Sequence, residues 1–187
     1  KAKADLDANG GLKQVIFVAC GGSFASSYPA RYLLGQESSL KVLGYNSSEF
    51  VNATPQTVGP NTLVIATSTK ATAETVEALR VANEKGAVTV GLSGYADSLT
   101  AQTARYYITY YHADEWYQDP SLVHYNSQGT ALKIAFWLLK EYDHYAAYDK
   151  AIEAFEKMPE IYGAAHESVK AKAAQFAMTY KDDTVWN

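Results

Sequence analysis

Short apolar runs alternate along this chain with longer stretches in which apolar residues recur at helical spacing. Two of these runs, Gln14–Ala19 and Thr62–Thr67, are apolar at most positions and rich in β-branched residues. This pattern is typical of a strand that is buried on both faces of a parallel sheet. Three weaker runs predict further strands: Leu40–Tyr45, Ala87–Leu92 and Arg105–Tyr111. The pattern therefore predicts five strands.

The segments between these strands predict helices or helical turns. Pro29 is expected to kink the second helix, and Gly86 is expected to end the helix that precedes the fourth strand. The expected helices are Lys1–Ala8, Phe24–Leu34, a short capped helix over 46–50 that has Glu49 near its start, Ala73–Lys85, and a short helix from Asp97-Ser98 to Ala104.

Two further helical patterns follow the fifth strand. Asn126-Ser127 is expected to cap a long apolar helix that runs to about Tyr142. From Tyr148 onward apolar residues again recur at helical spacing, and Pro159 suits the first position of a second helix in this stretch.

The alternation of strands and helices predicts an α/β fold, a three-layer αβα sandwich around a five-stranded parallel sheet with C-terminal helices. Right-handed crossovers leave few topologies, and the flavodoxin-like order 2-1-3-4-5 is the expected one. In this order strands 1 and 3 are neighbours, and ligands bind at the switch point beyond their carboxyl ends.

Two loops with the chemistry of an anion site follow these same strands. Gly21-Gly22-Ser23 comes after strand 1, and the four hydroxyls of Thr67, Ser68, Thr69 and Thr72 come after strand 3. Unpaired backbone N–H groups and the helix dipole favour a negative charge at such a junction. The alternative is that Ser23 and the threonines only cap helices. Because two arguments select one crevice, we expect a phosphate site there.

Composition narrows the range of partners. The 187 residues are 48% hydrophobic, and 16 basic and 20 acidic side chains give a net charge of −4 with no basic run. This argues against nucleic acid as the main partner. The single cysteine, Cys20, excludes an intrachain disulfide framework and favours a reducing, cytoplasmic compartment. No apolar run has the length of about eighteen residues that a membrane span needs, so no membrane partner is expected.

Three motifs together resemble a sugar isomerase (SIS) domain: Val-Ala-Cys-Gly-Gly-Ser at 18–23, Tyr-Asn-Ser-Ser-Glu-Phe at 45–50 and Ala-Thr-Ser-Thr-Lys-Ala-Thr-Ala-Glu-Thr at 66–75. Within that superfamily the chain is similar to the fructosamine-phosphate deglycases, relatives of the isomerase half of glucosamine-6-phosphate synthase. The resemblance covers roughly 14–187 and implies a tandem of two SIS domains. We expect 1–145 to be the first, and 146–187 to be a helical connection to a second that lies beyond this chain.

The resemblance also implies which residues bind the sugar phosphate. Its binding residues match Gly22, Ser23, Thr67, Ser68, Thr69, Thr72 and, at the start of the long helix, Ser127. Two positions depart from the family pattern. Lys70 replaces a glycine, so its side chain either crowds the loop or pairs with the phosphate. Gln128-Gly129 replaces a Thr-Lys that some relatives carry.

Catalytic residues are not assigned, because the resemblance implies that the catalytic carboxylate and histidine lie in the second domain. Of the four histidines, His112, His124, His144 and His166, only His124 near Ser127 is a candidate. No clustered set of metal ligands is present, so neither a metal nor another cofactor is expected.

The expected function is that of a fructosamine-6-phosphate deglycase, which releases hexose 6-phosphate and a free amino acid. The partner is then a phosphorylated sugar or sugar-amine, and the subunits are expected to form a homodimer or higher homo-oligomer. Two alternatives stay open. One is an aldose–ketose phosphosugar isomerase or amino-sugar phosphate deaminase, and the other is a non-catalytic sugar-phosphate sensor.

Overall fold

The structure, a computed structural model, describes residues 1–110 and 121–143, all within the first of two units into which the chain divides, Lys1–Ala146. The strands are β1 (Gln14–Ala19), β2 (Lys41–Asn46), β3 (Thr62–Thr67), β4 (Val88–Ser93) and β5 (Tyr106–Thr109). The helices are α1 (Ala2–Ala8), α2 (Gly21–Ser26), α3 (Tyr28–Glu37), α4 (Ser47–Asn52), α5 (Ala73–Glu84), α6 (Leu99–Thr103) and α7 (Ser121–Asp143).

The five strands form one parallel sheet in the order β2-β1-β3-β4-β5, which confirms the predicted order. The two runs with the strongest apolar pattern became the central strands β1 and β3, and every residue of both is buried. The edge strands β2 and β5 are partly exposed, which explains their weaker patterns.

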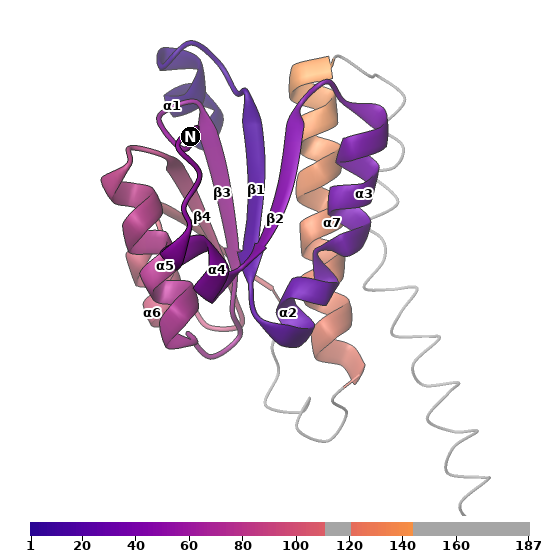
Figure 1. The fold of residues 1–187 in the computed structure, drawn as a ribbon. Helices are drawn as coiled ribbons and strands as arrows, with labels where there is room; N and C mark the ends of the chain where they lie inside the picture. The colour runs from indigo at the N-terminus through magenta and orange to yellow at the C-terminus, as the bar shows by residue number, and fades with distance from the viewer. Residues whose placement is uncertain (111–120, 144–187) are drawn as a thin grey trace, which may run out of the picture. The chain divides into compact units, whose positions relative to one another are not determined.

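Helices cover both faces of this sheet, as a three-layer sandwich requires. In Figure 1, α4, α5 and α6 lie on one side and α2, α3 and α7 on the other. On the first side, Phe50 of α4 is fully buried in a cluster with Ile16, Val18 and Val64 from the sheet and Ala78 from α5. This cluster holds α4 and α5, the helices that follow β2 and β3, against the sheet.

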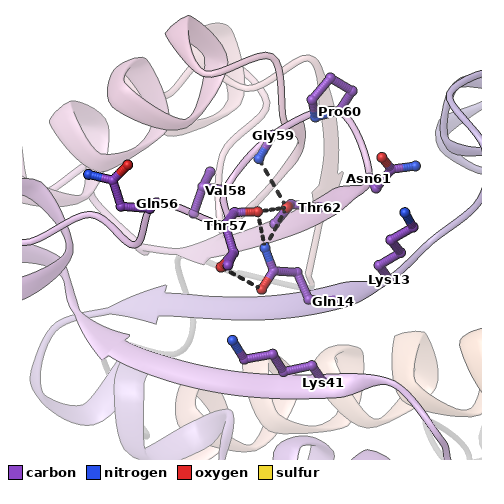
Figure 2. A pocket seen from close by; sticks show the side chains of 10 residues that line it. All are labelled: Lys13, Gln14, Lys41, Gln56, Thr57, Val58, Gly59, Pro60, Asn61 and Thr62. Carbon is purple, nitrogen blue, oxygen red and sulfur yellow. Dashed lines mark hydrogen bonds between the residues drawn. The ribbon is translucent and has the colours of Figure 1, made fainter.

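A buried glutamine at the start of β1 fixes the loop that leads into β3 (Figure 2). The Gln14 side chain is only 4% exposed, and its Nε2 donates to the Thr57 carbonyl at 2.6 Å and to Thr62 Oγ1 at 2.8 Å. Gln14 Oε1 accepts from the Thr57 hydroxyl at 3.2 Å. Because both ends of the amide are satisfied, this polar side chain is compatible with its burial.

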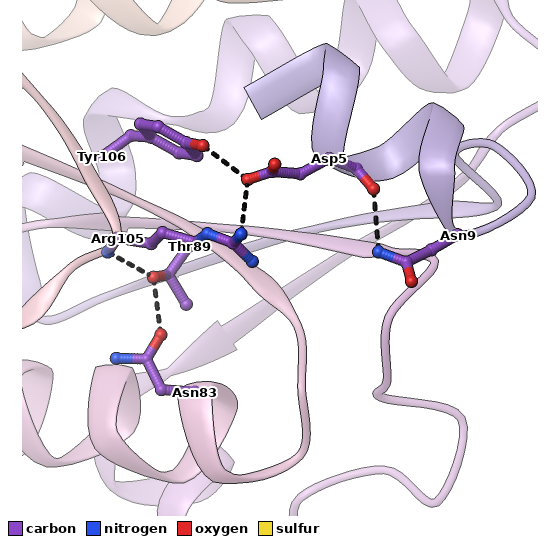
Figure 3. Close-up of polar contacts among 6 residues, drawn as sticks. All are labelled: Asp5, Asn9, Asn83, Thr89, Arg105 and Tyr106. Atoms are coloured by element: carbon purple, nitrogen blue, oxygen red, sulfur yellow. Dashed lines mark hydrogen bonds and ion pairs between the residues drawn. The ribbon is translucent and has the colours of Figure 1, made fainter. Parts of the chain in front are cut away.

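A second polar cluster ties α1 to β5 (Figure 3). Asp5 Oδ2 accepts from the Tyr106 hydroxyl at 2.5 Å and pairs with Arg105 Nη2 at 2.9 Å. The hydrogen bond to Asp5 raises the pKa of Tyr106. The backbone N of Arg105 donates to Thr89 Oγ1 at 2.8 Å, and Thr89 Oγ1 donates to Asn83 Oδ1 at 2.7 Å. One carboxylate therefore joins α1 to the start of β5.

Replacing Asp5 by alanine is expected to loosen α1, because Tyr106 and Arg105 both lose their acceptor. Asp5 is partly exposed, so the expected loss of stability is about 1 kcal/mol. Hydrogen exchange of the α1 amides should accelerate. Glu77→Ala, which removes only the exposed pair with Arg80, is the matched control and should leave α1 exchange unchanged. Unchanged α1 exchange in the Asp5 variant would show that α1 is held by its apolar contacts alone.

The second predicted helix is in fact two helices, and the predicted kink at Pro29 is wrong. α2 ends at Ser26 and α3 begins at Tyr28, with Pro29 in the first turn of α3. Proline lacks an N–H and clashes with the preceding turn, so it starts a helix more readily than it continues one. At the break, the hydroxyls of Ser26 and Ser27 donate to the carbonyls of Ser23 and Phe24 at 2.8 and 2.7 Å.

The long helix also begins earlier than predicted. α7 starts at Ser121, so the expected cap at Asn126-Ser127 is wrong and Ser127 lies inside the helix. The predicted helices beyond Tyr148, with Pro159, and the connection over 146–187 lie outside the described residues. The remaining helices lie where the sequence predicted them, to within one or two residues at most ends.

Candidate functional site

The carboxyl ends of the strands lie at one level. Ala19 of β1 is the register partner of both Asn46 of β2 and Thr67 of β3, and Thr67 pairs with Leu92 of β4. The loops that follow β1, β2 and β3 therefore begin side by side at this edge of the sheet. The sequence prediction that Ser23 and the hydroxyl-rich loop of 67–72 share one edge is confirmed at the level of topology.

Ser68 organises the loop between β3 and α5. It is 3% exposed, and its backbone N donates to the Leu92 carbonyl at 3.0 Å. Its Oγ accepts from the Thr72 backbone N at 2.8 Å and lies 2.9 Å from Thr72 Oγ1. Thr72 is the residue before the helix, but its own side chain makes no capping bond. The loop is thus closed on itself by Ser68, and the capping alternative for Thr72 is wrong.

Thr69 binds a residue that the sequence analysis did not select. Its Oγ1 lies 2.6 Å from the hydroxyl of Tyr110, just beyond β5, and its carbonyl accepts from Ser93 Oγ at 3.4 Å. Tyr110 is 3% exposed, and burial raises the pKa of its phenol. The contact depends on the pairing of β4 with β5, which no local pattern around Tyr110 indicates.

The outer part of the same loop faces solvent. Lys70, Thr72, Ala73 and Glu74 are exposed, and Ala71 adopts a left-handed backbone conformation with φ of 56°. Within the described part of the chain, the backbone N–H groups of Ala73 and Glu74 donate to no acceptor. Such first-turn N–H groups, together with the helix dipole, are suited to hold an anion.

The loop after β1 contributes an open surface to this edge. Cys20 has extended backbone angles and precedes α2, so Ser23 lies in the first turn of that helix and the alternative that it caps a helix is wrong. Gly22 is exposed and Ser23 is half-buried, and the Ser23 hydroxyl has no hydrogen-bond partner among the residues that the structure describes. That hydroxyl is therefore available to a ligand.

Helix α7 borders the same region. A hollow of about 320 Å³ is lined by Gly22, Ala25 and Ser26 of α2 and by Gln128 of α7. Ser127 is buried at 2% exposure. The structure thus brings Gln128, a departure from the family pattern, next to Gly22, and gives Ser127 an interior position.

The start of α4 completes the edge. Asn46 caps α4 by accepting from the Ser48 backbone N at 3.4 Å, and it also accepts from Cys20 Sγ at 3.8 Å. Ser47 Oγ lies 2.8 Å from Thr75 Oγ1, which joins α4 to α5. Glu49 lies in the first turn of α4, as predicted.

Among the residues that the structure describes, no group of three or more His, Cys, Asp or Glu side chains is placed to bind a metal. Across the same residues, no helix combines the length and apolar character needed to cross a bilayer. His124 lies in α7, whereas His112, His144 and His166 lie outside the described ranges.

Comparison with known proteins adds to this geometry. Residues 12–138 match the model of the SIS domain family. A curated relative, the fructosamine deglycase FrlB of Bacillus subtilis (strain 168), is 32% identical over 176 residues, which are 93% of this chain and 52% of that protein.

Two crystal structures, each provisionally assigned as a phosphosugar isomerase, share the fold. The one from Salmonella typhimurium LT2 has a TM-score of 0.77 and 36% identity, and the match covers 97% of this chain and 55% of that one. The one from Bacillus subtilis has a TM-score of 0.76 and 32% identity, with coverage of 96% and 54%. The chain spans about half the length of these relatives. With the family match, the strand order and the three motifs in agreement, the chain belongs to the SIS domain family.

Proposed function

We propose that the carboxyl edge of β1 and β3 binds the phosphate of a phosphorylated sugar or sugar-amine. The observation that carries the proposal is the shared register of Ala19 and Thr67, which places the loops after both strands at the switch point of the sheet. The proposed contacts are Gly22 and Ser23 from α2, Thr69 and Thr72 from the β3–α5 loop, and the first N–H groups of α5. Ser68 and Thr67 shape this loop from within.

An indirect role is proposed for Ser127, because this residue of α7 is only 2% exposed. The exposed ammonium group of Lys70 is proposed to approach the phosphate from the solvent side, since its residue lies at the outer turn of the loop. A phosphate held at one end fixes the distance of the sugar carbons from the catalytic groups.

For the whole protein we propose a fructosamine-6-phosphate deglycase, supported by the 32% identity to a fructosamine deglycase. In this reaction a base removes a proton from C1 of the fructosamine and an acid delivers one to C2, which gives the imine of the aldose; water then adds at C1 and the amine leaves. The products are hexose 6-phosphate and a free amino acid. The described residues bind and orient the substrate, and the proton-transferring groups are proposed to lie in a second SIS domain.

The decisive experiment assays the whole protein with fructosyl-lysine 6-phosphate and with analogues that carry other amino acids. Release of the free amino acid in amounts equal to hexose 6-phosphate is the expected result. Ammonia as a product, or conversion between two sugar phosphates without loss of an amine, would select the deaminase or isomerase instead. The isomerase is the second candidate because both similar crystal structures carry that provisional assignment. Binding without any turnover would favour a sensor.

Two conservative variants test whether the Thr69 hydroxyl contacts the phosphate. Thr69→Val keeps the shape but removes the hydroxyl, so KM should rise about ten- to a hundredfold, the effect of one hydrogen bond to a charged group. Tyr110→Phe removes the competing partner at 2.6 Å and leaves the Thr69 hydroxyl in place, so KM should stay level or fall. Equal increases in KM for both variants would mean that only their mutual hydrogen bond matters.

A further inference from the structure

Helix α2, which carries Gly22 and Ser23 of the proposed phosphate site, has few anchors of its own. It spans six residues, and no side chain caps its start. Helices this short are not stable alone in water, so contacts with the rest of the protein must hold it. Phe24 is the only large side chain of α2, and the hydroxyl of its one buried residue, Ser26, bonds within the helix to the Ser23 carbonyl. The orientation of α2 therefore depends on what the Phe24 ring contacts.

The Phe24 ring packs against the guanidinium group of Arg31. Arg31 belongs to α3, and its Cζ atom lies 4.3 Å from the centre of the Phe24 ring and 5.7 Å from the centre of the Tyr28 ring. An aromatic face attracts a cation, and the planar guanidinium group also stacks well on such a face. Arg31 thus links α3 to α2 through the side chain of Phe24.

A glycine in the edge strand β2 leaves room for this guanidinium group. A Cβ atom at Gly44 would overlap Arg31 Nη1 and would lie 2.9 Å from the Cδ and Cζ atoms of the same side chain. The guanidinium group therefore occupies the space that a side chain at position 44 would take. Any larger residue there would displace Arg31 from its place beside the Phe24 ring.

The position of Arg31 is not explained by an ion pair. Within the described chain Arg31 forms none, and its buried Nε atom has no hydrogen-bond partner. Burial lowers the pKa of the guanidinium group, because the charged form is less well solvated there. Partial burial of an unpaired charge is unfavourable, and the contacts with the two aromatic rings offset this cost.

We propose that Arg31 is a positioning residue for the phosphate site and acts through Phe24 on α2. By holding the Phe24 ring, Arg31 fixes the place of Gly22 and Ser23, the two residues of α2 that are proposed to contact the phosphate. The inference rests on the function proposed above. Arg31 touches no reacting atom in that scheme, so its loss should weaken binding of the phosphate and leave the chemical step nearly unchanged.

Steady-state kinetics of the whole protein with fructosyl-lysine 6-phosphate test this role in two ways. Arg31→Ala removes the guanidinium group, whereas Gly44→Ala keeps the group but displaces it. Each variant should raise KM about tenfold or more and change kcat by less than about twofold. Arg31→Lys keeps the charge without the planar group, so its KM should lie between those of the wild type and Arg31→Ala. Variants that lose stability but keep the wild-type KM would show a purely structural role and would overturn the proposal.

A double-mutant cycle tests whether Gly44 and Arg31 act through one contact. The three atoms nearest to a Cβ atom at Gly44 all belong to Arg31. Gly44→Ala should therefore raise KM when Arg31 is present and have little effect in the Arg31→Ala protein. Increases in KM that simply multiply in the double variant would contradict the proposal.

Two matched controls separate this effect from the loss of any arginine or any glycine. Arg80→Ala removes an arginine that forms an exposed pair with Glu77, and Gly35→Ala places a Cβ atom in open space on α3. Neither variant should change KM.

Two further measurements separate failure of this inference from failure of the phosphate site. Isothermal titration with glucose 6-phosphate should give a dissociation constant that rises in Arg31→Ala by the same factor as KM. Hydrogen exchange of the Phe24 amide, which donates to the Cys20 carbonyl at 3.3 Å, should accelerate in that variant. Wild-type protein that binds no glucose 6-phosphate would refute the phosphate site itself. Normal binding by Arg31→Ala, or unchanged exchange in α2, would refute only the role of Arg31.

Discussion

Ser68→Ala is expected to raise KM for the sugar phosphate more than Thr69→Val does, because it removes the atom on which the loop is built. The Thr72 backbone N would lose its acceptor at 2.8 Å, and the Thr72 hydroxyl would lose its partner at 2.9 Å. Thr72 is exposed, so water can replace part of what its N–H loses, and the lost hydrogen bond is expected to cost about 0.5–1.5 kcal/mol. The loop would relieve this cost by opening, and Thr69, Thr72 and the first turn of α5 would lose their common geometry.

Steady-state kinetics together with urea denaturation checks this prediction, since it requires a large change in KM and a modest loss of stability in one variant. Ser39→Ala is the matched control, because Ser39 is exposed and forms no hydrogen bond among the described residues. It should change neither quantity. A Ser68 variant with reduced stability but unchanged KM would remove this loop from the proposed phosphate site.

Phe50→Ala is expected to cause a large loss of stability, although Phe50 lies outside the proposed site. Phe50 is fully buried, and its ring lies 5.9 Å from the Tyr45 ring and within the cluster that joins α4, α5 and the sheet. Truncating a buried phenylalanine costs about 3–5 kcal/mol, against a typical total stability of about 5–15 kcal/mol.

Urea denaturation followed by circular dichroism measures this loss. Leu99→Ala is the control, because Leu99 is 54% exposed and its truncation should change the free energy of unfolding by no more than about 0.5 kcal/mol. Phe50→Leu should fall between the two. A Phe50→Ala protein as stable as the Leu99 variant would mean that α4 is not held by this cluster.

The parts of the fold that local patterns dictate were predictable from the sequence. β1 and β3 have the predicted bounds because a strand buried on both faces must be apolar throughout, and the cap at Asn46 and the stop at Gly86 depend on a few neighbouring residues. The edge positions of β2 and β5 follow from the order of the sheet.

The errors arose where two local signals compete. The sequence predicts a kink at Pro29, but Pro29 lies in the first turn of a new helix. The hydroxyls of Ser26 and Ser27 bond the last carbonyls of α2, which ends before it. The proline at position 120 in the sequence was the available signal that α7 starts at Ser121, and it outweighs the cap-like Asn126-Ser127.

Long-range contacts left no local signal at all. Tyr110 bonds to Thr69 across 41 residues of sequence, and Gln14 bonds to Thr57 across 43. Both depend on which strands pair and in which register. The grouping of hydroxyls at one edge was predictable because parallel strands share an edge. The hydrogen bond between Ser68 and Thr72 was not, because it depends on how the loop turns.

The left-handed backbone at Ala71 has one further consequence. Most chains place glycine in such a conformation, because a Cβ atom there costs about 1–2 kcal/mol. Ala71 carries this energetic cost. It also limits the conformations of the unbound loop, because glycine at this position would sample many more backbone conformations than alanine does. Alanine at this position therefore leaves the loop ahead of α5 fewer alternative conformations than glycine would, so less ordering opposes the capture of an anion.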